Sequence, residues 1–257
     1  MRGEKRVMPH LHNERKNFAI LIALVFFLST RNLAFAESNS SAIEWTNQCI
    51  RSAQNGKYQE AIEACSRAIE LDPKLAAAYI NRGNAHNEFG DRRQAIKDFN
   101  KAIELGPKVG AAYINRGNAY SSLGDHRQAI KDFDKAVELD PKVAVAYYSR
   151  GVAYGSLGDH RQAIKDFGKA VELEPKLVAA YYSRGVAYGS LGDHQQAIKD
   201  YDKAIELDPK LTPAYMNRGV AYGSLGDDEK AITDFRTAAR LGDRKAQDFL
   251  KSKGISW

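Results

Sequence analysis

Arginine and aspartate recur at a fixed spacing in this 257-residue chain, and such residues could either bind an anion or hold one another. The arginines are Arg82, Arg116, Arg150, Arg184 and Arg218, and an aspartate follows each by sixteen residues, at Asp98, Asp132, Asp166, Asp200 and Asp234. In residues 42–75 the two positions hold Gln48 and Ala64, so both members are absent together. Because a buried guanidinium is costly without a carboxylate, we predict structural pairs, such as Arg150 with Asp166 and Arg184 with Asp200. The alternative is a row of anion-binding arginines.

Three histidines, His126, His160 and His194, recur every 34 residues. A metal ion needs ligands that converge within about 2 Å of it, whereas equivalent residues of neighbouring repeats lie roughly a helix-packing distance apart or more. We therefore expect these histidines on the surface and predict no metal site. The sequence also contains no glycine-rich phosphate loop, paired-histidine metal motif or nucleophile elbow. We predict that the protein is not an enzyme and needs no cofactor.

The elements that must position these side chains are repeats of 34 residues. Residues 144–177 return as residues 178–211, with 27 of 34 positions identical. The same frame divides the chain into six repeats, at residues 42–75, 76–109, 110–143, 144–177, 178–211 and 212–245. A repeat that cannot bury both of its faces alone must stack on its neighbours. The sequence therefore predicts one elongated repeat array.

Each repeat has the pattern of two amphipathic helices. In the fourth repeat, Tyr147 and Gly151 fall on one helical face, and Ala163 and Phe167 fall on the face of a second helix. Small residues such as Gly151, and Gly185 in the next repeat, mark places where two helix backbones approach closely. Each repeat is thus expected to be a helical hairpin.

The turns carry their own signals. Gly158 supplies the left-handed residue that closes the first helix, and Asp159 with Gln162 resembles a capping box that opens the second. Pro175 has no amide hydrogen and ends the second helix. After the sixth repeat, Ala246, Phe249 and Leu250 share one helical face, which predicts a capping helix and tail over residues 243–257, with residues 251–257 frayed.

The repeat resembles the tetratricopeptide repeat. The matching residues of the fourth repeat are Tyr147, Gly151, Tyr154, Ala163, Phe167, Ala170 and Pro175, and the resemblance covers 204 of 257 residues. It implies an all-α fold, a right-handed superhelical solenoid of six helix-turn-helix repeats with a C-terminal capping helix. It also implies that the first helix of each repeat lines a concave face.

The resemblance assigns the residues that face the concave side, and these differ between the two halves of the array. The N-terminal half offers asparagines, and the C-terminal half offers tyrosine, valine and methionine above the glycines Gly155, Gly189 and Gly223. The predicted partner-binding residues are Asn81, Asn84, Asn115, Asn118, Tyr148, Val152, Tyr182, Val186, Met216 and Val220. Asparagine amides can bond the main chain of a peptide, and the tyrosine and valine stripe can take apolar side chains.

We therefore predict a non-enzymatic protein–protein interaction scaffold that binds an extended peptide or a partner helix in its concave groove. The alternatives are a structural solenoid that associates with itself, a binder of a cell-envelope polymer, and solvated concave residues with no ligand. Members of the family that clamp a terminal carboxylate use lysine and arginine at such positions, and these cations are missing here. The identity of the partner does not follow from the sequence.

The N-terminus has the pattern of a secretory signal peptide over residues 1–36. A basic stretch precedes the apolar run Phe18 to Leu28, and Ala34, Phe35 and Ala36 form a small-x-small site before Glu37. We expect an exported protein, periplasmic or secreted, with no membrane insertion after signal removal; the alternative is an uncleaved anchor. Residues 37–41 form a short polar lead-in to the repeats.

The formal charge of +6 does not indicate a nucleic-acid partner. Residues 1–36 hold six Lys or Arg against two Glu, which is +4, so the rest of the chain carries 6 − 4 = +2. The lysines and glutamates of the second helices, such as Lys165, Lys169 and Glu172, have the pattern of a solvated face. We predict no nucleic-acid binding.

The chain has two cysteines, Cys49 and Cys65, and both fall in the first repeat. Their positions face the contact between the two helices of that repeat, and an exported chain meets an oxidising compartment. A disulfide and two small buried thiols that never meet are both compatible with this pattern.

Overall fold

The computed structural model describes residues 40–257, and all the regular secondary structure in that range is helical. The all-α fold predicted from the sequence is confirmed for this part of the chain. The predicted signal peptide, residues 1–36, lies outside the described residues, as do residues 37–39 of the predicted lead-in. Residues 40 and 41 of that lead-in already belong to a helix that covers residues 40–54.

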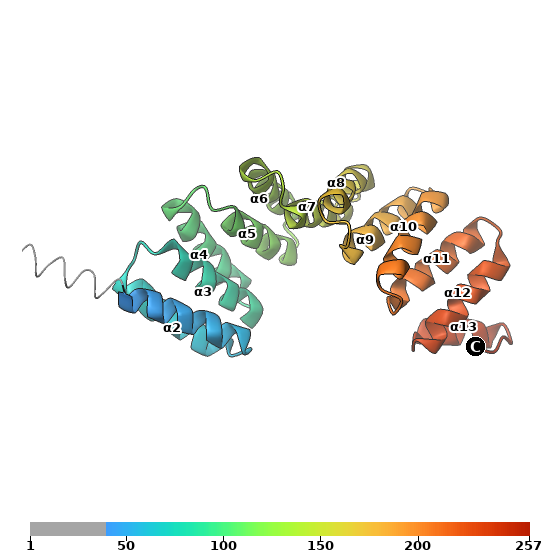
Figure 1. Cartoon of the computed structure of the whole chain (residues 1–257), viewed down its shortest axis with the longest axis horizontal. Coiled ribbons are helices and arrows are strands. Elements are labelled where there is room, and N and C mark those ends of the chain that lie inside the picture. The colour runs from blue at the N-terminus through green and yellow to red at the C-terminus, as the bar shows by residue number, and fades with distance from the viewer. Residues whose placement is uncertain (1–39) are drawn as a thin grey trace, which may run out of the picture. The chain divides into compact units, whose positions relative to one another are not determined.

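The chain divides into two compact units, Met1–Phe89 and Gly90–Trp257, and the boundary falls between the two helices of the second repeat. In the first unit, the helix of residues 40–54 precedes α2 (Tyr58–Leu71) and α3 (Ala76–Phe89) (Figure 1). α2 packs against α3. One core cluster of this unit is built from small side chains, Cys49, Ala61, Ala64, Cys65 and Ala85.

The second unit is a run of helices that pack in chain order (Figure 1). They are α4 (Arg92–Leu105), α5 (Gly110–Ser122), α6 (His126–Leu139), α7 (Ala144–Ser156), α8 (His160–Leu173), α9 (Val178–Ser190), α10 (His194–Leu207), α11 (Thr212–Ser224), α12 (Asp228–Arg240) and α13 (Arg244–Ser252). Each helix packs against the next, and α7 also contacts α5 and α9, and α9 contacts α11. The first helices of consecutive repeats therefore lie side by side.

Local chemistry sets the bounds of the helices. Gly158 has a φ of 79°, a left-handed conformation that follows α7, and the Asp159 side chain accepts a hydrogen bond from the Gln162 backbone N at 3.1 Å. Only this half of the predicted capping box forms, because the Asp159 backbone N–H donates to the Tyr154 backbone oxygen at 2.9 Å instead of to the Gln162 side chain. α8 ends at Leu173, two residues before Pro175. The short turns keep the two helices of a repeat antiparallel neighbours.

Glycine and an aromatic ring define the closest contact between the two helices of a repeat. A Cβ on Gly151 would lie 2.7 Å from the Phe167 ring, and a Cβ on Gly185 would lie 2.7 Å from the Tyr201 ring. No side chain fits in that space, so the ring packs directly on the opposite backbone. This contact fixes the distance between the two helices.

The C-terminal capping helix is confirmed as α13. Ala246 and Leu250 are fully buried in the last core cluster, and the Phe249 ring meets the Phe235 ring edge-on at 4.9 Å. The prediction of a frayed tail after residue 250 is wrong in part. Ile255 packs against the same cluster, and the Arg236 guanidinium donates a hydrogen bond to the Ser256 backbone oxygen at 3.0 Å. The array is thus closed by helix and tail together.

Candidate functional site

The repeating arginines and aspartates form bidentate pairs in the second unit. The Arg150 guanidinium donates from Nε to Asp166 Oδ2 at 2.8 Å and from Nη2 to Asp166 Oδ1 at 2.7 Å. Its remaining terminal nitrogen, Nη1, bonds Asp134 of the preceding repeat at 2.7 Å. The same pairing joins Arg116 to Asp132, Arg184 to Asp200 and Arg218 to Asp234. In the first unit, Arg82 bonds the Ser66 hydroxyl at 3.1 Å.

The surroundings of these arginines match a structural role better than anion binding. Asp166 is 6% exposed, and the hydrogen bonds that Arg150 donates to its carboxylate raise the pKa of Arg150. Arg150 also lies over the Tyr147 ring, with its guanidinium carbon 5.5 Å from the ring centre. Because carboxylates engage Nε, Nη1 and Nη2 of Arg150 together, an anionic ligand there would have to displace one of them.

One arginine lacks the partner from the preceding repeat. Asn100, Asp134 and Asp202 bond Arg116, Arg150 and Arg218 respectively, but Gly168 occupies the equivalent position beside Arg184. A Cβ on Gly168 would lie 3.6 Å from Arg184 Nη1. The junction between the fourth and fifth repeats is therefore without the ion pair that joins the repeats on either side.

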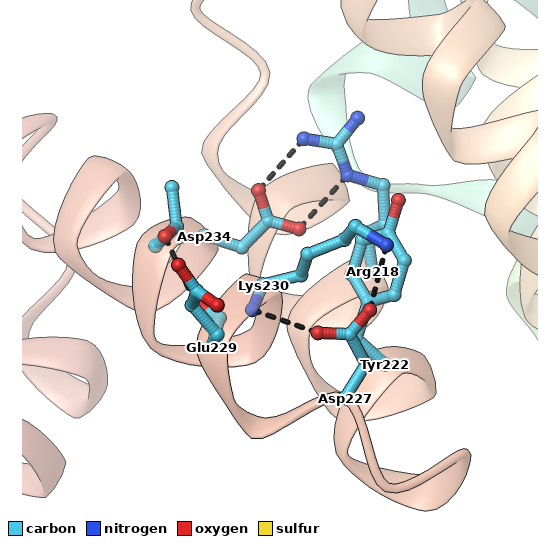
Figure 2. Close-up of a pocket in the computed structure, with 7 residues that line it drawn as sticks. Arg218, Tyr222, Asp227, Glu229, Lys230 and Asp234 are labelled. Carbon is cyan, nitrogen blue, oxygen red and sulfur yellow. Dashed lines mark hydrogen bonds and ion pairs between the residues drawn. The ribbon is translucent and has the colours of Figure 1, made fainter.

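A hollow of about 420 Å³ lies on the sixth repeat (Figure 2). Figure 2 shows that Arg218 bonds Asp234 and that Lys230 bonds Asp227. Lys230 also lies over the Tyr222 ring, with its Nζ 5.2 Å from the ring centre. Since carboxylates of the same repeat neutralise both cations, this hollow has no charge ready for an anionic ligand.

Two pockets at equivalent places in consecutive repeats form what we call the groove of the second unit. The first pocket has a volume of about 340 Å³ and is lined by Val152, Gly155, Ser156, His160, Phe167, Tyr182, Ser183, Val186 and Ala187. The second pocket has a volume of about 260 Å³ and is lined by Val186, Gly189, Ser190, His194, Ala197, Tyr201, Asn217, Val220 and Ala221. Val186 lines both, so the pockets adjoin. Neither contains a lysine, arginine, aspartate or glutamate.

The predicted binding residues of the second unit divide between these pockets and the core. Val152, Tyr182 and Val186 line the first pocket, and Val220 joins Val186 in the second. Tyr148 lines neither pocket, and its ring centre is 5.8 Å from that of Phe167. Met216 packs against the last core cluster. Asn115 and Asn118 are half-buried on α5 and line neither pocket.

Asn81 and Asn84 lie in the first unit, where they line a separate pocket of about 310 Å³. Ile50, Ala53, Gln54, Tyr58, Ala85 and Glu88 complete its lining. The Asn81 side chain donates its Nδ2 hydrogen to the Ala77 backbone oxygen at 2.9 Å, so its own helix uses one of its amide hydrogens. This pocket is the counterpart, between the first and second repeats, of the pockets in the groove.

Family models match most of the repeat array. The tetratricopeptide repeat model matches residues 76–109, 110–143, 144–177 and 178–211, a TPR repeat model matches residues 53–90, and another tetratricopeptide repeat model matches residues 212–241.

The chain belongs to the tetratricopeptide repeat family.

Solved structures of this architecture give three useful comparisons. MamA is 31% identical with a TM-score of 0.60, over 64% of this chain and 96% of that one. YrrB, described as a TPR protein with an unusual peptide-binding site, is 26% identical with a TM-score of 0.63, over 74% and 99%. PilF from Pseudomonas aeruginosa, at 15% identity and a TM-score of 0.73 over 84% and 99%, shares the fold. A comparison with curated proteins finds no match.

Several residues of this tetratricopeptide repeat groove were missed by sequence reasoning. His160 and His194 were expected only on the surface, and Phe167 only in the core, yet all three line pockets. Asn217 was also missed; its amide donates a hydrogen bond to the Tyr182 hydroxyl at 3.0 Å. Burial raises the pKa of Tyr182. The repeat pattern could have shown that His160 and His194 share one environment, because they stand at the same position of successive repeats.

The histidines do not assemble a metal centre in the described part of the chain. His160 and His194 line different pockets, and the His126 ring shares a hydrogen bond with the Ser121 hydroxyl at 3.2 Å. Within residues 40–257, no group of three or more His, Cys, Asp or Glu side chains is placed to hold a metal ion. The same residues include no helix that is both long and apolar enough to span a membrane.

Cys49 and Cys65 are joined by a disulfide in the first repeat, with their Cα atoms 5.3 Å apart. Both are fully buried in the core of the first unit. The bond links the helix of residues 40–54 to α2. Lys57 provides no side-chain cap for α2, whereas an aspartate caps the second helix of each later repeat.

Proposed function

We propose that this tetratricopeptide repeat protein is a non-enzymatic scaffold that holds a segment of a protein partner in the groove of the second unit. The observation that carries the proposal is the pair of adjoining, uncharged pockets at equivalent places in consecutive repeats. Apolar pockets with a few polar groups are the usual form of a ligand site. Val152, Val186 and Val220 are 37%, 38% and 56% exposed, so the rim of the groove offers apolar surface to a partner.

Site-specific crosslinking tests the groove. A photoreactive amino acid in place of Val186 should form an adduct with the partner, because Val186 lines both pockets. The matched control is the same amino acid in place of Lys165, which is exposed on α8 and lines neither pocket. Adducts at Lys165 without adducts at Val186 would indicate that the partner binds the second helices and not the groove.

We also propose that the protein works outside the cytoplasm. The signal-like pattern of residues 1–36 supports export, and a disulfide between Cys49 and Cys65 suits an oxidising compartment. Cleavage after Ala36 should produce a mature chain that begins at Glu37. Mass spectrometry of the intact protein from the extracytoplasmic fraction measures this directly, and a full-length chain retained in the membrane fraction would indicate an uncleaved anchor instead.

Self-association is a second candidate, favoured by apolar side chains at the C-terminal end. Leu241, Phe249 and Trp257 are 40%, 40% and 45% exposed. Light scattering should show a mass that grows with concentration if copies associate through this end, and Trp257→Ser should reduce the growth. A constant monomer mass at all concentrations would exclude this role.

A further inference from the structure

The two pockets of the groove differ in chemistry although they occupy equivalent positions. Phe167 lines the first pocket, and Tyr201 holds the same repeat position in the second. Ser183 of the first pocket corresponds to Asn217 of the second. The first pocket is also the larger, at about 340 Å³ against about 260 Å³. At these two positions the first pocket therefore offers a hydrocarbon ring in a larger space, and the second offers a phenol and an amide in a smaller one.

The Tyr201 hydroxyl lies beside the Asn217 amide at the wall of the second pocket. Tyr201 is only 3% exposed, and its Oη would lie 3.8 Å from a Cβ on Gly189, which places it at the wall of the second pocket. Burial raises the pKa of Tyr201, so the phenol keeps its hydrogen at neutral pH. The Asn217 Nδ2 group can only donate to this oxygen. A ligand that supplies an acceptor oxygen can therefore take the hydrogen of this phenol.

The spacing of the pockets limits the conformation of the ligand. The first helices that carry them contact one another, so their axes are about 8–10 Å apart. In a polyproline II segment, side chains three residues apart share a face and are separated by about 9.3 Å. In a β-strand, residues on one face are about 6.6 Å or about 13 Å apart. The polyproline II period fits the spacing of consecutive pockets, and neither strand period does.

The groove also offers hydrogen-bond donors of the kind that an extended main chain needs. The Tyr182 oxygen accepts a hydrogen bond from the Asn217 amide, and the Tyr182 hydroxyl can donate its own hydrogen to a ligand in the first pocket. A polyproline II segment has free carbonyl groups, whereas a helix satisfies its backbone internally. Neither lining contains a lysine, arginine, aspartate or glutamate, which disfavours a charged group in the pockets.

We propose that the groove binds a polyproline II segment with a large aliphatic side chain in the first pocket and, three residues away, a small neutral side chain with an acceptor oxygen in the second. Threonine and serine are the side chains that fit the second pocket, where the Tyr201 hydroxyl donates to them. The Tyr182 hydroxyl donates to a main-chain carbonyl between the two. This assignment rests on the groove being the partner-binding surface.

Synthetic peptides test the assignment on the purified protein. The probes are a peptide containing Leu-Pro-Pro-Thr, its reversed sequence Thr-Pro-Pro-Leu, and the analogues with valine in place of threonine, since valine has the shape of threonine without an acceptor. Fluorescence anisotropy should show that one of the two orders binds about three- to tenfold more tightly with threonine than with valine, the range for one neutral hydrogen bond.

Matched variants identify the group responsible. Tyr201→Phe should abolish the preference for threonine and keep the fold, because Phe167 is the natural residue at that position of the preceding repeat. Tyr154→Phe, which removes a hydroxyl outside both linings, should leave the preference unchanged. Gly155→Leu should fill the first pocket and weaken binding at least tenfold. Gly223→Leu, at the equivalent place in the sixth repeat and in neither lining, should not.

Each result has one meaning. An equal threonine preference in Tyr201→Phe would overturn the role of that hydroxyl. Tighter groove binding by a peptide with leucine and threonine two residues apart, or seven apart in a helix, would overturn the polyproline II spacing. If none of these peptides binds while Val186 still crosslinks to a partner, the assignment fails and the groove proposal stands. If Val186 forms no adduct with a partner, the groove proposal itself is wrong.

Discussion

Two glycines of α7 show that one residue type can hold opposite roles within a single helix. Gly151 faces the Phe167 ring so closely that a Cβ would lie 2.7 Å from it, whereas the nearest atom to a Cβ on Gly155 is the Ala163 Cβ at 4.0 Å. Packing therefore requires the first glycine but not the second. Glycine in a helix interior costs about 0.5–1 kcal/mol relative to alanine, so Gly155 lowers stability while it keeps the first pocket open.

The two glycines should therefore respond to alanine with opposite signs. Gly151→Ala should destabilise the protein by roughly 1–3 kcal/mol, because the Phe167 ring must move. Gly155→Ala should stabilise it by about 0.5–1 kcal/mol through helix propensity. Chemical denaturation measures both free energies of unfolding. A change of the same sign in both variants would contradict the close approach at Gly151 or the open space at Gly155.

The pairing of Arg150 with Asp166 makes a second residue-scale prediction. Arg150→Ala leaves a carboxylate that is 6% exposed without its bidentate partner and should cost about 1–3 kcal/mol or more. The double variant with Asp166→Ala should recover part of that loss. Strict additivity in this double-mutant cycle would show that the two side chains do not interact.

At the scale of helices and turns, local signals predicted most of the structure. Gly158, Asp159 and Pro175 act on their own neighbourhood, so the residues themselves mark where α7 ends and where α8 begins and ends. The pocket linings depend on packing between repeats, which a single repeat does not reveal. Met216 is a concave residue by its position in the repeat, yet it packs against the last core cluster, as Tyr148 and Tyr182 at the same repeat position pack against theirs.

The ion pair that is missing beside Arg184, between the fourth and fifth repeats, leads to a prediction about helix packing. Gly168→Asp should place a carboxylate beside Arg184 Nη1 and join α8 to α9, as Asp134 and Asp202 do for their neighbours. A partly exposed pair adds about 0.2–1 kcal/mol, on top of the change in helix propensity.

Gly168→Ala is the control for propensity, because it adds a Cβ without a charge. Salt should separate the two variants, since an ion pair at the surface is screened. The free energy of unfolding of Gly168→Asp relative to Gly168→Ala should fall as salt is raised to about 1 M. A difference that does not depend on salt would mean that no ion pair forms with Arg184.

At the scale of the whole molecule, the regular 34-residue repeat does not reveal that the chain divides into two compact units. The second repeat has the same sequence pattern as the others, but the boundary between the compact units falls inside it, between Phe89 and Gly90. Sequence reasoning predicted one continuous array, because the pattern of helix faces and turns does not change there. The strength of packing between two helices depends on the sum of their contacts, and periodicity alone does not report that sum.

The disulfide should make this division measurable. Cys49 and Cys65 are sixteen residues apart and both lie in the first unit, so the bond limits the unfolded freedom of that unit alone. A loop of about 15 residues corresponds to about 3 kcal/mol in the chain-entropy model. Reduction should therefore lower the stability of the first unit by about that amount and leave the second unit unchanged, since both cysteines of the chain belong to the first unit.

Hydrogen exchange followed by mass spectrometry separates the two units in one sample. Peptides from α2 should lose protection on reduction, and peptides from α8 to α10 should keep theirs. The variant with Cys49→Ala and Cys65→Ala should reproduce the effect without reductant and should not respond to it. If α8 to α10 lost protection to the same extent as α2, the two units would unfold together, and the boundary at Phe89 would have no energetic meaning.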